Sequence, residues 1–125
     1  SHYKLMMELI EYPVKGIFCE KPLALDVQHA RDMIQMCEKK KIVLAVNHTR
    51  RWDSNYLFVT KLISSGKIGS IKAMHLIYPG QIYNIGTHIF DAIRMMTGKE
   101  VVQVSGISKD CSIPDPHISG WLKFE

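Results

Sequence analysis

The fold is decided by residues 16–46, GIFCEKPLALDVQHARDMIQMCEKKKIVLAV. A short apolar run at 16–19 is followed by Asp26, a residue that suits the N-cap of a helix. From there to about Lys41, apolar residues recur at the spacing of a helix. Residues 42–46 are apolar without alternation, which predicts a strand covered on both faces. Strand, helix and strand in this order form a βαβ unit, which implies a parallel sheet.

The remainder of the chain also alternates helix and strand patterns, so the predicted fold class is α/β. Asp53 or Ser54 can cap the helix that follows the βαβ unit, and Gly98 suits the left-handed residue after a helix. We expect helices over residues 3–12, 53–66 and 86–97, and strands over 70–78, 101–107 and 121–124.

Composition limits the classes to which this chain can belong. Of its 125 residues, 46% are hydrophobic and 22% are charged, which is typical of a globular protein. The longest apolar run, 42–46, is far shorter than the ~20 residues that cross a membrane, and no basic segment with an apolar run opens the chain. We therefore expect neither a membrane protein nor a secreted one, and place the protein in the cytoplasm.

Charge and cysteine usage argue against two further classes. The net charge is +4, and the one dense basic run, 39–41, closes a predicted helix, where cations complement the helix dipole. Since no aromatic residues interleave with this run, a solvated helix end is favoured over a nucleic-acid surface. Cys19, Cys37 and Cys111 are scattered without a CxxC pair, so we expect reduced thiols and no metal site.

Three segments, in the right order and spacing, carry a resemblance to a known family. They are GIFCEKPLALDVQHARDMI at 16–34, IVLAVNHTRRW at 42–52 and NIGTHIFDAIRMMTG at 84–98. Together they resemble the middle of an oxidoreductase of the Gfo/Idh/MocA type, and the Glu-Lys-Pro-Leu-Ala string after a strand is a fairly specific part of the match. Members of that family use NAD(H) or NADP(H) to oxidise or reduce hydroxyl carbons of sugars, cyclitols and related compounds.

The resemblance implies how the chain is organised. Residues 1–51 would be the C-terminal remnant of an NAD(P)-binding Rossmann domain, and residues 52–125 would be the start of a C-terminal α/β domain for substrate binding and oligomerisation. The expected fold is thus an incomplete Rossmann-like βαβ unit followed by an open, mostly antiparallel sheet with helices on one face, α+β in character. Because sheets of the second domain in this family often pair between subunits, we also expect a homo-oligomer.

Lys21 is the first candidate for chemistry. It stands where a parallel strand ends, on the side of an open sheet where ligands bind. Pro22 restricts the backbone of Lys21 to extended conformations and could hold an unusual peptide geometry. An ammonium fixed there can donate to a substrate hydroxyl and to the alkoxide-like charge that develops as hydride leaves. The alternative is a surface lysine; the resemblance favours the site, and implies that Glu20 organises Lys21 or the cofactor ribose.

His88 is the second candidate. The family has a histidine here that follows an aspartate by four residues, and both face the substrate, but the earlier position in this sequence is Asn84. That spacing at a helix start places the two side chains next to each other. An imidazole titrates near neutral pH, so His88 suits a general base that takes the hydroxyl proton. Asn84 can orient the imidazole or a substrate hydroxyl but cannot stabilise an imidazolium by charge. A helix-capping contact is the alternative for His88.

Three further residues complete the candidate site. Asp91 matches an acidic position of the family, and a structural hydrogen bond explains it as well as a direct role does. Arg51 with Trp52 resembles an Arg-aromatic pair that the family places near the nicotinamide or the substrate, and packing with a surface ion pair is the alternative. Tyr83 precedes Asn84 in a predicted loop and could line the substrate pocket. The remaining histidines have no spacing that suggests a metal site.

One motif of dinucleotide-binding folds is missing. The glycine-rich GxGxxG turn, which brings the pyrophosphate to a helix N-terminus, does not occur in the 125 residues. We therefore expect an internal fragment of a larger dehydrogenase that acts on a sugar or polyol, a poor NAD binder that is inactive by itself. The alternative is a non-catalytic oligomerisation or binding module without the cofactor half. The retained pair Lys21 and His88 favours the first hypothesis, since a structural remnant has no physical reason to keep both.

Overall fold

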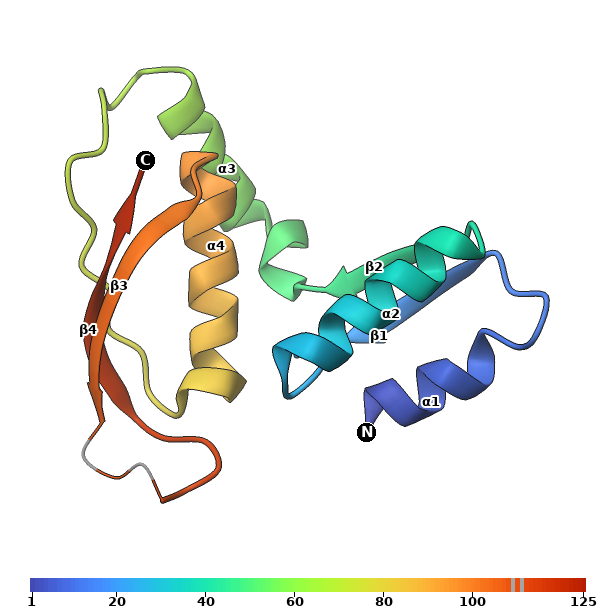
Figure 1. Ribbon diagram of the computed structural model, residues 1–125. Helices are drawn as coiled ribbons and strands as arrows, with labels where there is room; N and C mark the ends of the chain where they lie inside the picture. Colours follow the sequence, from blue (N-terminus) through green and yellow to red (C-terminus); the bar gives the residue numbers. More distant parts are fainter. Residues whose placement is uncertain (109, 111) are drawn as a thin grey trace. The chain divides into compact units, whose positions relative to one another are not determined.

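The computed structural model describes residues 1–108, 110 and 112–125, and its elements are shown in Figure 1. The expected thiol of Cys111 therefore lies outside the described residues. The chain divides into two compact units, Ser1–His48 and Thr49–Glu125. Thr49, Arg50 and Arg51 thus belong by their packing to the second unit.

The first unit contains the predicted βαβ arrangement. Its elements are α1 (His2–Leu9), β1 (Gly16–Glu20), α2 (Val27–Lys39) and β2 (Val43–Asn47). The two strands are parallel, with a register that runs from Gly16 opposite Val43 to Glu20 opposite Asn47. Asp26 caps α2 as expected, because its side chain accepts a hydrogen bond of 2.8 Å from the backbone amide of His29.

The core of the first unit lies on one face of this strand pair. A single cluster of buried side chains joins both helices to the strands: Met6, Ile10, Cys19, Met33, Cys37 and Ile42. Because successive side chains of a strand point to opposite faces, Cys19 turns into the core while its neighbour Phe18 turns outward. Phe18 is 67% exposed and Val43 is 71% exposed. The prediction that the second strand is covered on both faces is therefore wrong, because both helices pack on the same side.

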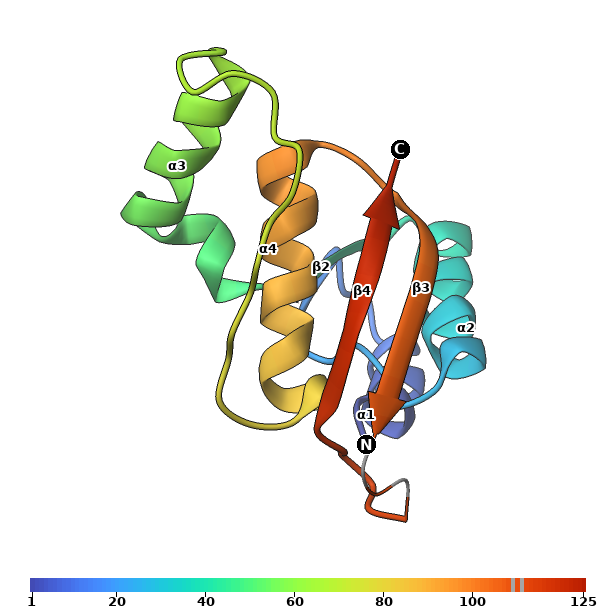
Figure 2. The same ribbon diagram turned by 90° about the vertical axis from the view of Figure 1, so that its left-hand side faces the viewer.

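The second unit combines helices with an antiparallel strand pair. Its elements are η1 (Thr49–Trp52), α3 (Ser54–Ser64), η2 (Ile82–Gly86), α4 (Thr87–Thr97), β3 (Val101–Ser108) and β4 (Ile118–Phe124). Figures 1 and 2 show α3 beside α4, and β3 beside β4. The α4 helix buries Ala92 and Ile93, and it ends at Gly98, which has the expected left-handed conformation with φ of 64°. Asp53 caps α3 through the amides of Asn55 and Tyr56.

Two elements of the second unit differ from the sequence predictions. Residues 70–78 form no strand; in the described part of the chain β3 and β4 pair only with each other. Alternating residues favour an extended backbone, but a strand also needs a neighbouring strand to satisfy its backbone groups. The segment instead borders a mainly apolar space of about 1930 Å³ beside α4, β3 and β4. The helix predicted from Gly86 is preceded by η2, a single π-helical turn where a loop was expected.

No described helix combines the length and the apolar character that crossing a bilayer requires. Within the same residues, no group of three or more His, Cys, Asp or Glu side chains could hold a metal ion.

Candidate functional site

The first set of candidate residues follows directly on β1. Glu20 is the last residue of the strand, and Lys21 and Pro22 come next, joined by a cis peptide bond, which is the unusual geometry that Pro22 allows. The Nδ1 atom of His2 in α1 donates to the carbonyl oxygen of Pro22 at 2.9 Å. The side chain of Lys21 is half-buried. These residues occupy the carboxyl end of a parallel strand, where open α/β sheets bind their ligands.

Asn47 joins this set although its own sequence context does not single it out. It ends β2 opposite Glu20 in the strand register, and its Nδ2 atom donates to Glu20 Oε1 at 2.5 Å. The amide thus fixes the direction of the carboxylate at the shared edge of the two strands. Asn47 could have been predicted from the strand register, because two parallel strands of equal length place their last residues, Glu20 and Asn47, opposite each other.

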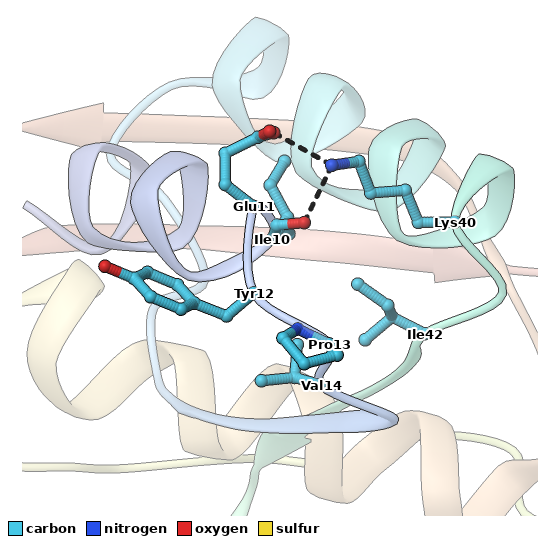
Figure 3. A pocket seen from close by; sticks show the side chains of 7 residues that line it. All are labelled: Ile10, Glu11, Tyr12, Pro13, Val14, Lys40 and Ile42. Carbon is cyan, nitrogen blue, oxygen red and sulfur yellow. Dashed lines mark hydrogen bonds and ion pairs between the residues drawn. The ribbon is translucent and has the colours of Figure 1, made fainter.

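A hollow in the first unit lies at the other end of the same strands. It has a volume of about 410 Å³ and is lined by Ile10, Glu11, Tyr12, Pro13, Val14, Lys40 and Ile42 (Figure 3). Lys40 Nζ donates to the carbonyl oxygen of Ile10 at 2.7 Å and to Glu11 Oε1 at 2.8 Å. Since Val14 precedes β1 and Ile42 precedes β2, this hollow is at the amino ends of the strands. We therefore assign no ligand to it.

The second set of candidate residues lies on η2 and the first turn of α4. Tyr83 and Asn84 belong to η2, and His88 is the second residue of α4. Tyr83 is 49% exposed, Asn84 is exposed and His88 is half-buried. A ligand can therefore reach all three side chains from solvent. Single π-helical turns next to α-helices occur frequently at functional sites.

The start of η2 is held by a segment far along the chain. The backbone amide of Tyr83 donates to Asp115 Oδ1 at 2.8 Å, and that of Asn84 donates to Asp115 Oδ2 at 3.1 Å. The amide of Ile82 donates to the carbonyl oxygen of Pro116 at 3.1 Å. The sequence gives no local indication of these contacts, which join residues more than thirty positions apart.

Arg51 and Asp91 contact each other in the second unit. Arg51 Nε donates to Asp91 Oδ1 at 3.0 Å and to Oδ2 at 2.9 Å, and Nη2 donates to Oδ1 at 2.8 Å. The Asp91 side chain is 7% exposed and that of Arg51 is 44% exposed. The hydrogen bond to Asp91 is the main cause that raises the pKa of Arg51 above its usual value. The pair joins η1 to α4. This contact agrees with the ion pair considered as the alternative for Arg51 and with the structural hydrogen bond considered for Asp91.

Comparisons with known proteins agree with this architecture. Residues 1–48 match the model of the Gfo/Idh/MocA oxidoreductase family, described by its NAD-binding Rossmann fold. Inositol 2-dehydrogenase of Rhizobium meliloti is 31% identical over 105 residues, which cover 73% of this chain and 32% of the relative. The scyllo-inositol 2-dehydrogenase (NADP(+)) IolW of Bacillus subtilis is 28% identical over 108 residues, which cover 72% of this chain and 30% of the relative.

A solved structure shows the same fold. Scyllo-inositol dehydrogenase from Lactobacillus casei, with bound NAD(H) and scyllo-inositol, matches with a TM-score of 0.72 at 24% identity, over 90% of this chain and 39% of that one. The chain spans about a third of the length of the two curated relatives. The family model, these relatives and the α/β fold all agree. The chain therefore belongs to the Gfo/Idh/MocA oxidoreductase family.

Proposed function

We propose that this chain is part of a dehydrogenase that transfers hydride between NAD or NADP and a hydroxyl carbon of a sugar, cyclitol or similar polyol. The observation that carries the proposal is the polar group at the carboxyl ends of β1 and β2. There Asn47 holds the Glu20 carboxylate, and Lys21 follows on the next residue. The inositol dehydrogenases among the relatives support a cyclitol as the substrate class. We assign residues 1–51 to the cofactor domain and residues 52–125 to the substrate domain, although the last three residues of the first range, 49–51, pack with the second unit.

The residues at this strand edge suit one portion of a dinucleotide site. A carboxylate with a fixed direction, such as that of Glu20, accepts hydrogen bonds from ribose hydroxyls well, and Lys21 and Pro22 are the other residues of this strand end assigned to the cofactor. Arg51, which the resemblance also assigns to the cofactor, lies in the second unit and is paired with Asp91. The nicotinamide supplies or accepts the hydride when it is bound. The 125 residues contain no glycine-rich turn, so we assign no pyrophosphate contact to them.

Charge and proton transfer are assigned to Lys21 and His88. The Lys21 ammonium donates to the reacting hydroxyl oxygen and stabilises the negative charge that develops on it. His88 takes the hydroxyl proton as a general base. Asn84 orients the imidazole or a neighbouring hydroxyl, Tyr83 lines the substrate side, and Asp91 supports this helix through its ion pair with Arg51.

Cofactor binding provides the test. NADH is titrated against the full enzyme that contains this chain, because the 125 residues alone are expected to bind NADH poorly. The fluorescence of NADH is followed, with Lys21→Ala as the variant and Lys15→Ala as the matched control. Lys15 is exposed and lies just before β1, at the end of the strand remote from Lys21. We expect Lys21→Ala to weaken NADH binding about tenfold or more, as the loss of a charged hydrogen bond does, and Lys15→Ala to leave it unchanged. Equal weakening by both variants, or no NADH binding at millimolar concentration, would contradict the proposal.

A second function is supported by a different observation. The outer face of the β1–β2 pair exposes Phe18 and Val43, and β3 and β4 expose Val104, Ile107 and Trp121. Exposed apolar sheet surface favours association, so a non-catalytic oligomerisation or binding module is the alternative. Sedimentation equilibrium over a range of concentrations separates the two. Self-association without any NADH binding would favour the module.

A further inference from the structure

We propose that Asp115 is a positioning residue that sets the direction in which Tyr83 and Asn84 face the substrate, an inference that rests on the proposed function. Asp115 lies in the segment between β3 and β4 and is not part of the sequence-predicted site. Its two carboxylate oxygens are divided between two successive amides, those of Tyr83 and Asn84. It therefore holds the backbone of both candidate substrate residues at once.

The contact replaces a local cap. Gln81, which precedes η2, makes no side-chain hydrogen bond to the helical amides. The first amides of a helical segment have no partner within it, so Asp115 and the Pro116 carbonyl supply acceptors for Ile82, Tyr83 and Asn84. A negative charge at this end of the segment is also favoured by the helix dipole, and amide hydrogen bonds to a carboxylate are stronger than those to neutral acceptors.

The sequence around Asp115 restricts its backbone. Proline stands on both sides, at 114 and 116, and a residue that precedes proline is confined to extended conformations. The carboxylate is half-buried. Because the backbone of Asp115 is already restricted, it loses less backbone entropy when the carboxylate binds the two amides.

The effect extends from the backbone to the side chains that meet the substrate. Tyr83 and Asn84 are exposed, and the fixed backbone sets the direction in which each side chain leaves the main chain. Thr87 Oγ1 donates to the carbonyl oxygen of Tyr83 at 2.9 Å and so links this turn to the residue before His88. Release of Asp115 should therefore change how a polyol is held more than how fast its hydride is transferred.

The first experiment follows the amides themselves. Hydrogen exchange and NMR shifts of Tyr83 and Asn84 are compared between the protein, Asp115→Asn, and Asp110→Asn as the matched control. Asp110 lies in the same segment, and its carboxylate accepts hydrogen bonds from the amide and hydroxyl of Ser112, whereas its backbone contacts Ser108. Asparagine offers one acceptor oxygen instead of two, so in Asp115→Asn at least one of the two amides should exchange about tenfold faster. Identical exchange in both variants would overturn the inference, and the mild substitution keeps the fold intact.

The second experiment measures steady-state kinetics with myo-inositol in the full enzyme that contains this chain. We expect Asp115→Asn to raise KM about five- to tenfold with kcat within about twofold, and Asp115→Glu, which restores the charge, to recover part of the loss. Asp110→Asn should leave both constants unchanged. An unmodified enzyme that oxidises neither myo-inositol nor other cyclitols and sugars would refute the proposed function, whereas equal KM values in an active Asp115→Asn enzyme would refute the positioning role alone.

Discussion

The pair formed by Arg51 and Asp91 should contribute a measurable coupling free energy to the second unit. The perturbation is a double-mutant cycle of Arg51→Ala, Asp91→Ala and the double variant. Such a cycle isolates the interaction between the two side chains from the other contacts that each of them makes.

The magnitude follows from the different exposure of the two partners. Breaking a fully buried ion pair costs about 3–5 kcal/mol, whereas an exposed pair contributes below about 1 kcal/mol. Here the carboxylate is 7% exposed and the guanidinium 44%, with three hydrogen bonds between them. We therefore expect a coupling free energy of about 2 kcal/mol, between the two limits. Arg51→Ala should be the more damaging change, since it leaves a buried carboxylate without its cation.

Urea unfolding followed by tryptophan fluorescence is the suitable assay, because Trp52 and Trp121 both lie in the second unit. The matched control is the pair formed by Arg94 and Glu100, whose hydrogen bonds are also bidentate but whose side chains are 47% and 63% exposed. That pair should show a much smaller coupling free energy. Equal coupling in the two cycles, or coupling below about 0.5 kcal/mol for Arg51 and Asp91, would refute the reasoning from burial.

Three further predictions concern stability and reactivity. Gly120→Ala should lower the free energy of unfolding by about 1–3 kcal/mol, because its Cβ would overlap the carbonyl oxygen of Ser105. Gly106→Ala should cost less, since only an Ile118 methyl at 3.1 Å must yield, and equal urea midpoints would contradict this. Burial raises the pKa of the Cys19 and Cys37 thiols, so iodoacetamide should alkylate them more slowly in the folded chain than in urea. Because the folded state holds these two protons more tightly than the unfolded state does, their contribution to the free energy of unfolding should stay constant below pH 9.0 and fall as the pH rises above that value. The fall should be smaller in the double variant Cys19→Ala, Cys37→Ala. Asp26→Ala should remove about 1 kcal/mol through the lost cap of α2, seen as a lower urea midpoint by circular dichroism, and an unchanged midpoint would argue against the cap.

The features that the sequence predicts correctly depend on neighbours in the chain. Asp26 and Asp53 cap helices through amides two or three residues away, and Gly98 ends α4 because glycine adopts a positive φ at little cost. The βαβ unit is found for the same reason, since the periodicity of each element lies within its own residues. Glu20 and Lys21 are placed correctly at a strand end, while their chemical roles stay predictions.

The features that the sequence misses depend on distant partners. Residues 70–78 have a strand-like pattern, but the pairing that makes a strand is not encoded within the segment itself. The contact of Asn47 with Glu20 depends on strand register, and that of Asp115 with Tyr83 on the course of the segment before β4. Local composition carries no information on either contact.

The cap supplied by Asp115 has a consequence for the order in which the chain is made. Tyr83 and Asn84 are synthesised 32 and 31 residues before Asp115, which at ~5–20 residues per second is an interval of roughly 2–6 s. During that interval the acceptors that Asp115 and Pro116 supply to the first amides of η2 are absent. Pauses in translation between the codons of Asn84 and Asp115 would prolong the time in which η2, the turn before the helix of the proposed general base, lacks its acceptors.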